Sequence, residues 1–367
     1  MRVHVVDPAA YTPPYDHALC SALAAAGADV TLLTTRFAHG PVAQPDGYRV
    51  EHAFYRRGGG AGRMRRAARL AQHVPDMLAL RRRVRDADVV HFQWLSVQQL
   101  DAHLLPRGVP LVLTAHDVLP REPRLGQRRA QRRLLERVDA VIVHSEHGRA
   151  RLTGELGLDP ARVTVIPHGA FTHLAEPARA APLPPELAAV EGPVVLLFGL
   201  MRPYKGIDVA LEAWRGVEGA ELWIVGMPRM DTASLRAAAP PGVRFVERFV
   251  GDEELPAYFR RADLVLLPYR EIEQSGVLFT ALAFGAPLLL SDVGGFPEVA
   301  AHGAAATFPS GDAAALRAEL DRLLGDPAAR AALRAAAQLA ARERYGWPGI
   351  ARAHLELYAR LAGRSAN

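Results

Sequence analysis

Short apolar runs of about strand length recur through the first half of the chain, separated by longer stretches with helical character. The apolar runs occupy residues 3–6, 30–34, 89–92, 111–114, 141–144 and 163–166. Between the first two runs, residues 18–26 predict a helix that ends at Gly27. This alternation of strand and helix predicts an α/β domain built on a mainly parallel sheet.

A second domain with the same pattern is predicted after a proline-rich segment. Residues 167–193 hold six prolines, which is typical of a connection between domains. Apolar runs then return at 194–198, 222–225, 243–246, 264–267 and 288–290, and helices are predicted at 313–324 and 328–344. Sheets of this kind bind ligands at the carboxyl ends of their strands, so we expect a ligand cleft where two such domains face each other.

Length and cysteine content agree with an ordinary globular protein of two domains. The chain has 367 residues, and Cys20 is its only cysteine. No disulfide can form within the chain, which favours a reducing compartment. The apolar run after Met1 is too short for the core of an export signal, and no run of about 18 apolar residues occurs without charge. We therefore predict a cytoplasmic protein.

Positive charge is concentrated in the first half of the chain. The net charge is +8 for residues 1–170 and −3 for the remainder, and arginines cluster at 63–69, 81–85 and 121–133. These clusters are either solvated helix faces or a patch for an anionic partner, such as a membrane surface, a lipid diphosphate or a nucleic acid. Aromatic residues are not interleaved with the arginines, which argues against nucleic acid. Peripheral contact with the inner face of an anionic membrane remains open.

The first segment with candidate functional residues holds the only lysine of the chain. Gly199, Arg202, Lys205 and Gly206 follow the predicted strand at 194–198 and precede a helix with an apolar face. A glycine-bearing loop between a strand and a helix start offers backbone N–H groups to an anion. Two cations beside it suit a diphosphate leaving group, whose negative charge grows as a glycosidic bond breaks.

A second segment of this kind follows the strand at 264–267. Ser275 and Gly276 begin a helix that stops at Gly285, so free backbone N–H groups point outward at its start. Glu271 and Glu273 precede the helix and can accept hydrogen bonds from sugar hydroxyls. This segment predicts a second phosphate-binding helix terminus. Two glycines at 294–295 make a further turn after the strand at 288–290.

The first half offers candidate residues at the same edge of its sheet. His116 closes the strand at 111–114 and is placed to bind the transferred sugar or the acceptor. Residues 11–16 follow the first strand, and His168 lies where the domains join.

These segments together resemble the retaining GT-B glycosyltransferases, in the family 4-like group that includes bacterial mannosyl- and glucosyltransferases and sucrose synthase. The resemblance covers nearly the whole chain and is carried by residues 114–117, 165–169, 205–206, 275–287 and 294–298. Two departures concern the donor contacts. Leu200 stands where the family commonly has an arginine, and Ile272 and Thr280 stand where it commonly has two glutamates.

The resemblance implies two Rossmann-like domains, at 1–172 with a returning helix at 348–367, and at 173–347. It implies a donor bound mainly by the second domain and an acceptor bound mainly by the first, with no metal and no cofactor besides the nucleotide sugar. As catalytic residues we predict His116, Arg202, Lys205 and Glu271. On the donor side we predict Gly199, Arg202, Lys205, Gly206, Gly226, Phe249, Val250, Glu273, Gln274, Ser275, Gly276, Val277, Leu278 and Thr280. On the acceptor side we predict Tyr15, Asp16, His91, Asp117 and His168.

The predicted reaction is the transfer of a hexose from a nucleotide-diphosphate sugar to an acceptor hydroxyl, in the synthesis of surface glycans, glycolipids or glycoconjugates. The acceptor is a glycan, a lipid-linked or a small molecule. A sugar-nucleotide epimerase of the same fold and a non-catalytic sugar- or nucleotide-binding protein are the alternatives. A pyridoxal-phosphate phosphorylase needs a Schiff-base lysine, and the only lysine lies in the phosphate loop.

Overall fold

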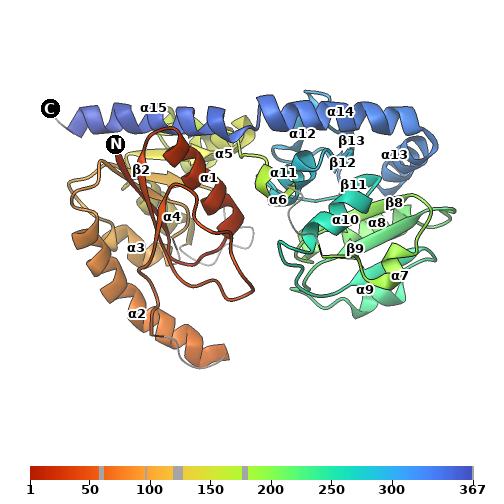
Figure 1. Cartoon of the computed structure of the whole chain (residues 1–367), viewed down its shortest axis with the longest axis horizontal. Coiled ribbons are helices and arrows are strands. Elements are labelled where there is room, and N and C mark those ends of the chain that lie inside the picture. The colour runs from red at the N-terminus through yellow and green to blue at the C-terminus, as the bar shows by residue number, and fades with distance from the viewer. Residues whose placement is uncertain (58–61, 96, 119–126, 176–180, 366–367) are drawn as a thin grey trace. The chain divides into compact units, whose positions relative to one another are not determined.

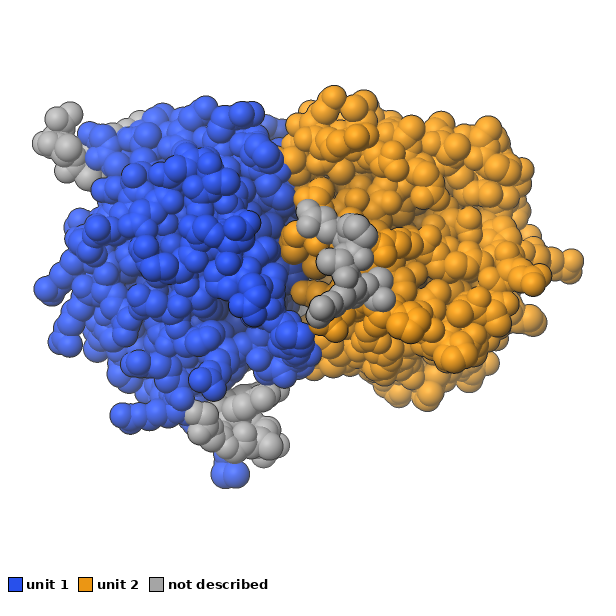
Figure 2. Space-filling model, in the orientation of Figure 1, with its two compact units in different colours: residues 1–169, 347–367 blue, residues 170–346 orange. Residues whose placement is uncertain are grey.

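The computed structural model describes residues 1–57, 62–95, 97–118, 127–175 and 181–365, and the chain divides into two compact units. Unit 1 contains Met1–Gly169 and Trp347–Asn367, and unit 2 contains Ala170–Gly346 (Figure 2). Each unit is built on one parallel sheet with helices around it (Figure 1). The predicted α/β architecture with two parallel sheets is thereby confirmed.

Unit 1 has a seven-stranded sheet with the order β3-β2-β1-β4-β5-β6-β7, and all its neighbouring strands are parallel. The strands are β1 (Arg2–Asp7), β2 (Asp29–Thr34), β3 (Arg49–His52), β4 (Val89–Phe92), β5 (Leu111–Thr114), β6 (Ala140–Val143) and β7 (Val163–Val165). The helices are α1 (Pro13–Ala25), α2 (Gly62–Arg83), α3 (Gln98–Leu104), α4 (Gln127–Leu135), α5 (Glu146–Leu156) and α15 (Trp347–Ser365). A 3₁₀ turn, η1, spans Pro160–Arg162.

Unit 2 has a six-stranded parallel sheet with the order β10-β9-β8-β11-β12-β13. The strands are β8 (Val194–Phe198), β9 (Glu221–Val225), β10 (Val243–Val246), β11 (Leu264–Leu267), β12 (Leu288–Ser291) and β13 (Ala306–Phe308). The helices are α6 (Thr172–Ala175), α7 (Pro185–Ala188), α8 (Ile207–Ala213), α9 (Ala233–Ala237), α10 (Leu255–Arg261), α11 (Gly276–Ala283), α12 (Phe296–Ala300), α13 (Ala313–Gly325) and α14 (Pro327–Glu343). The 3₁₀ turn η2 (Pro203–Lys205) precedes α8.

Local sequence signals explain where several helices begin and end. The Ser145 hydroxyl accepts a hydrogen bond from the Gly148 N–H and begins α5, which ends at Gly157 in a left-handed conformation. Asp312 and Asp326 cap α13 and α14 in the same way, by accepting backbone N–H groups at 2.9 Å.

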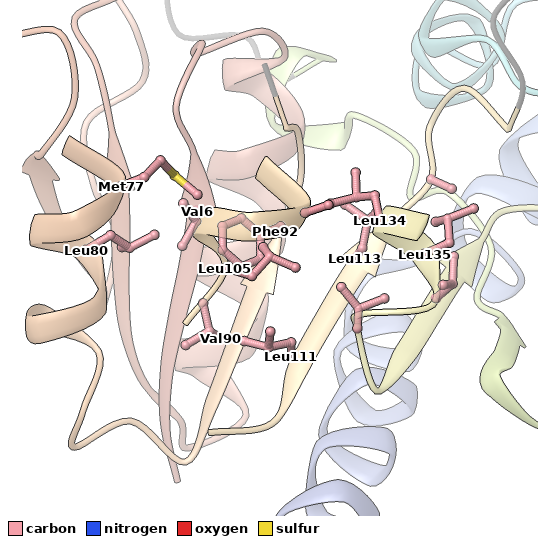
Figure 3. Close-up of a cluster of buried hydrophobic side chains, with 14 of the residues drawn as sticks. Val6, Met77, Leu80, Val90, Phe92, Leu105, Leu111, Leu113, Leu134 and Leu135 are labelled. Atoms are coloured by element: carbon pink, nitrogen blue, oxygen red, sulfur yellow. The ribbon is translucent and has the colours of Figure 1, made fainter. Parts of the chain in front are cut away.

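The core of unit 1 lies between its sheet and the helices packed on it. Val6, Val90 and Phe92 of the strands meet Met77 and Leu80 of α2 in one apolar cluster (Figure 3). The apolar strands are buried on both faces, as expected when helices cover both sides of a parallel sheet. One face of α2 is therefore fixed to the sheet.

The C-terminal helix α15 belongs to unit 1, where it packs against α1 and β4. His354 and Tyr358 of this helix lie beside His91 of β4, and Tyr358 Oη is 2.6 Å from His91 Nδ1. Among the described residues, none of the helices combines the length and apolarity that a membrane span requires.

Candidate functional site

The loop between β8 and α8 brings the only lysine to the carboxyl edge of the unit 2 sheet. Gly206 is left-handed (φ +65°), and a Cβ at this position would overlap the Pro268 carbonyl oxygen at the end of β11. The loop therefore lies directly against the end of the neighbouring strand. Lys205 is 5% exposed, and its Nζ donates a hydrogen bond to Tyr269 Oη at 2.5 Å.

Gly199 allows the lysine ammonium to lie close to the end of β8. A Cβ at this position would stand 3.1 Å from Lys205 Nζ and 3.1 Å from Val277 Cγ2. A Cβ on Gly226, at the end of β9, would overlap the Gly199 carbonyl oxygen. Gly199, Lys205, Gly226 and Val277, which we predicted from distant parts of the sequence, therefore lie together.

Two arginines near this loop differ in whether their guanidinium group is already bound to a carboxylate. Arg270 binds the Asp208 carboxylate through two hydrogen bonds of 2.7 and 2.5 Å, and this guanidinium lowers the pKa of Asp208. The exposed Arg202 side chain forms no hydrogen bond or ion pair with another described residue. Arg202 is thus the cation beside Lys205 that a ligand can use.

The segment before α11 carries the predicted acidic residues in two different environments. Glu271 is exposed, whereas Glu273 is buried and its backbone carbonyl accepts the Gly295 N–H at 3.1 Å. Gly294 is left-handed (φ +58°), and a Cβ there would overlap the Ile272 carbonyl oxygen. The glycine turn after β12 thus supports the loop that leads into α11.

The Gly276 and Val277 N–H groups at the start of α11 donate to none of the described residues. Ser275 occupies the N-cap position, and its hydroxyl makes no capping hydrogen bond. Thr280, where the family commonly has a glutamate, is buried and donates its hydroxyl to the Gly276 carbonyl oxygen at 2.9 Å. Gln274 is half-buried and Leu278 is buried. Phe249 and Val250 follow β10 at the same sheet edge, where Phe249 is 37% exposed.

In unit 1, three histidines surround the buried Tyr15 at the carboxyl edge of the sheet. The ring centroids of His116 and His168 each lie 4.8 Å from that of Tyr15, and His144 lies at 5.6 Å. Trp347, at the start of α15, closes the group at 5.3 Å from Tyr15. Sequence reasoning missed His144 and Trp347, because no local pattern links them to His116.

Hydrogen bonds fix the orientation of these histidines. His144 donates its Nδ1–H to the Ile166 carbonyl oxygen at 3.0 Å, and its Nε2 lies 3.2 Å from His116 Nδ1. His116 Nε2 donates its N–H to Gln93 Oε1 at 3.0 Å, and the Trp94 ring stacks on His116 with a centroid distance of 4.9 Å. Gln93, His144 and Trp94 therefore orient the His116 imidazole.

Burial determines the charge of this group. Burial lowers the pKa of His116 and of His168 well below the ordinary value, and repulsion from His144 adds to the effect. Burial also lowers the pKa of His144 to about 4. All three side chains are neutral at pH 7, so they offer hydrogen bonds rather than positive charge.

Three residues predicted on the acceptor side, Tyr15, Asp16 and His91, are interior. His91 is fully buried between Tyr358 and Thr114, and Asp16 is buried against Asp7, where burial and the neighbouring carboxylate raise its pKa well above the ordinary value. These side chains support the sheet edge from within, and their part in acceptor binding stays a prediction. Asp117 is exposed at the end of β5.

Comparisons with known proteins agree on one family. The family model "Glycosyltransferase Family 4" matches residues 15–174, and "Glycosyl transferases group 1" matches residues 192–326. The chain belongs to the family 4-like glycosyltransferases. Neither matched model supports the epimerase or the non-catalytic alternative.

Curated relatives of this family 4-like glycosyltransferase include the D-inositol 3-phosphate glycosyltransferases of Mycobacterium tuberculosis and Mycobacterium bovis. They are 29% identical over 308 residues, which cover 75% of this chain. The match spans 62% of the length of those relatives.

Solved structures share the GT-B fold over nearly the whole chain. Sucrose-phosphate synthase from Thermosynechococcus elongatus matches with a TM-score of 0.77 at 20% identity, covering 99% of this chain and 100% of that one. HepE from Anabaena, in complex with UDP-glucose, matches with a TM-score of 0.75 at 19% identity, covering 98% and 100%.

Proposed function

We propose that this chain transfers a hexose from a nucleoside diphosphate sugar to an acceptor hydroxyl, with retention of anomeric configuration. The observation that carries the proposal is the buried Lys205, which is held between Gly199 and Tyr269 at the carboxyl edge of the unit 2 sheet. An ammonium in this place suits a diphosphate. The exposed Arg202, which pairs with none of the described residues, supplies a second positive charge.

In the proposed reaction the bond between the anomeric carbon and the diphosphate oxygen breaks as the acceptor oxygen bonds to that carbon. The acceptor hydroxyl attacks from the side of the leaving group, and a phosphate oxygen takes its proton. Lys205, Arg202 and the N–H groups at the start of α11 bind the diphosphate as its charge grows. Glu271 and Glu273 accept hydrogen bonds from donor hydroxyls, and the neutral His116 binds a sugar hydroxyl.

A uridine nucleotide is the first donor to test, because HepE, which shares this fold, is described in complex with UDP-glucose. We expect selective binding of one nucleotide from a panel of UDP-, GDP-, ADP- and TDP-sugars, measured by titration calorimetry, followed by slow donor hydrolysis. NMR of the transferred sugar reports its anomeric configuration. A chain that binds none of these donors contradicts the proposal.

For the acceptor, we propose a phosphate-bearing polyol. Unit 1 carries most of the positive charge, and the curated relatives are named for inositol 3-phosphate. Inositol 3-phosphate and glucose 6-phosphate represent free acceptors, and vesicles that contain phosphatidylinositol represent a lipid-linked one. Transfer to one of these sources distinguishes a soluble acceptor from a lipid-linked acceptor.

We further propose that α2 binds an anionic lipid surface. Four apolar side chains of α2 are exposed beside the face that packs in the core: Met64 (72%), Leu70 (53%), Val74 (37%) and Leu78 (44%). They lie within about a third of the helix circumference. The helix carries seven arginines and one acidic residue, and it lies at the periphery of unit 1 in Figure 1. Apolar residues beside many cations favour an anionic membrane interface.

Flotation with vesicles tests this surface. We expect the chain to float with anionic phosphatidylglycerol vesicles at low salt, less at moderate salt, and not with neutral phosphatidylcholine. Replacing Leu70 and Leu78 together by glutamine should lower partitioning by about tenfold. Leu339→Gln, at an exposed apolar position of α14 in unit 2, is the matched control. Equal binding to neutral vesicles, or dimerisation through α2 without flotation, would refute the proposal.

A further inference from the structure

A tyrosine outside the residues discussed above is held at the carboxyl end of β3 in a strained conformation. Tyr55 has φ +49°, and among the described residues only it and Ala10 have a positive φ without being glycine. Such a backbone is costly for a bulky residue and persists only where its surroundings impose it. Ala10 follows β1, so both strained residues lie at the carboxyl edge of the unit 1 sheet.

Four side chains of α2 impose the conformation of the segment at 55–57. The Asp76 carboxylate accepts the Tyr55 N–H at 2.7 Å. Gln72 pairs with the backbone of Arg57, accepting its N–H at 2.9 Å and donating to its carbonyl oxygen at 2.8 Å. The Arg69 guanidinium lies over the Tyr55 ring at 5.3 Å, and the fourth side chain, His73, bonds its hydroxyl.

The Tyr55 hydroxyl ends a hydrogen-bonded chain that begins inside unit 1. The Asp101 carboxylate is fully buried and accepts the Val97 N–H at 2.8 Å and the His73 Nε2–H at 2.6 Å. With its proton on Nε2, His73 offers Nδ1 as an acceptor, and the Tyr55 O–H donates to it at 2.8 Å. The hydroxyl proton therefore points inward, and the lone pairs of the oxygen are directed away from His73.

The same buried carboxylate also connects Tyr55 to the histidine group. Asp101 fixes Val97, and the loop that ends there begins at Gln93 and Trp94, which contact His116. Asp101, which orients His73 and Tyr55, thus also holds Val97. The residues at the other end, Gln93 and Trp94, contact the candidate sugar-binding residue His116. Tyr55 itself is half-buried.

We propose that Tyr55 is an acceptor subsite: its oxygen accepts a hydrogen bond from a hydroxyl group of a polyol acceptor, and His73 and Asp101 are positioning residues that keep it an acceptor. This inference rests on the proposed glycosyl transfer and names a recognition residue for it. A serine-type triad orders carboxylate, imidazole and hydroxyl in the same way, but here the ordered group binds rather than attacks.

Tyr55→Phe removes only the hydroxyl, and we expect it to raise the KM for the acceptor about tenfold, with kcat and donor affinity nearly unchanged. Tyr48→Phe is the matched control. Tyr48 precedes β3, at the amino end of the strand, and its hydroxyl also bonds a histidine, His17, at 3.0 Å. A merely structural Tyr55 would make the two variants alike: both would lose some thermal stability and neither would change the acceptor KM.

Asp101→Asn tests the direction of the hydrogen bonds that run from Tyr55 through His73 to Asp101. The Val97 N–H holds the asparagine oxygen, so the amide N–H₂ faces His73 and moves its proton to Nδ1. His73 then donates to Tyr55, whose own O–H turns outward as a donor. We expect the acceptor KM to rise as in Tyr55→Phe although the hydroxyl is still present, and the double variant to be no worse than either single one.

The probes are inositol 3-phosphate, glucose 6-phosphate and myo-inositol. Each is assayed as an acceptor in the presence of the donor, and its binding without donor is measured by saturation-transfer NMR. Wild type that neither transfers to nor binds any of these polyols, while still hydrolysing the donor, overturns the subsite but not the donor function. Loss of donor hydrolysis in the wild type instead contradicts the proposed function itself. An unchanged acceptor KM in Tyr55→Phe also overturns the subsite.

Discussion

Replacing Lys205 by methionine is expected to lower kcat/KM with a nucleotide sugar by about 100-fold or more. The ammonium lies at the edge where the strands of the unit 2 sheet end, and its contact with Tyr269 keeps it in place without a change in conformation. A fixed positive charge stabilises the departing diphosphate without reorganisation, so its loss raises the barrier rather than weakening the fold.

Stability separates this role from a structural one. Methionine has nearly the shape of lysine, and removing a buried charge also removes the cost of its desolvation. We therefore expect the melting temperature of Lys205→Met to equal or exceed that of the wild type while turnover falls. Lys205→Arg keeps the charge, but the planar guanidinium has little room, because the ammonium lies close to Gly199. This variant should also be slow.

Arg317→Gln provides the control for a lost cation in unit 2. Arg317 is half-buried on α13, where it bonds Asp321 and the carbonyl oxygen of Gly216 beyond the end of α8. Since α8 starts at the carboxyl edge of the sheet, its far end lies at the opposite edge. Wild-type turnover is expected for Arg317→Gln, measured as nucleotide release beside Lys205→Met. Near-normal turnover in the methionine variant would exclude leaving-group stabilisation by Lys205.

The strands that could be predicted from the sequence are those whose side chains are buried on both faces. Val194–Phe198 and Leu264–Leu267 form continuous apolar runs and appear as β8 and β11. The strand β3 (Arg49–His52) was missed, because it is a largely exposed edge strand with polar residues. The strand β13 (Ala306–Phe308) was missed because three residues carry no periodic signal.

Some residues of the candidate site could be predicted from the sequence and others could not. Lys205 could be found because it is unique in the sequence and lies between a strand and a helix start. The group around Tyr15 could not, because His116, His144 and Trp347 meet only after the chain has crossed the sheet and returned through α15. The hydrogen bonds that link Asp101, His73 and Tyr55 could not be predicted either, because the three residues come from separate parts of the sequence.

Acid is expected to unfold unit 1 at a pH at which unit 2 remains folded. Burial is the main cause that lowers the pKa of five histidines in unit 1: His91, His116, His144, His168 and His354. For His144 and His354 the folded pKa is about 4, whereas an unfolded histidine titrates near 6.5. Below about pH 6.5 the unfolded state therefore binds more protons, and stability falls as the pH falls toward 4.

Two carboxyl groups of unit 1 oppose this trend without cancelling it. Burial raises the pKa of Asp7 and of Asp16, so the folded state holds their protons at a higher pH than the unfolded chain does, and acidification favours folding there. The histidines outnumber the two carboxyls, so we expect the stability of unit 1 to fall as the pH drops from about 6.5 toward 4.

Tryptophan fluorescence can follow each unit separately, because Trp94 and Trp347 belong to unit 1 and Trp214 and Trp223 to unit 2. Replacing either pair by phenylalanine leaves a reporter for the other unit, and limited proteolysis mapped by mass spectrometry provides a second measurement. His354→Leu removes one titrating group, whose buried Nε2 has no hydrogen-bond partner among the described residues, and should shift the acid midpoint of unit 1 to lower pH. A unit 1 that unfolds in acid no earlier than unit 2 would refute this prediction.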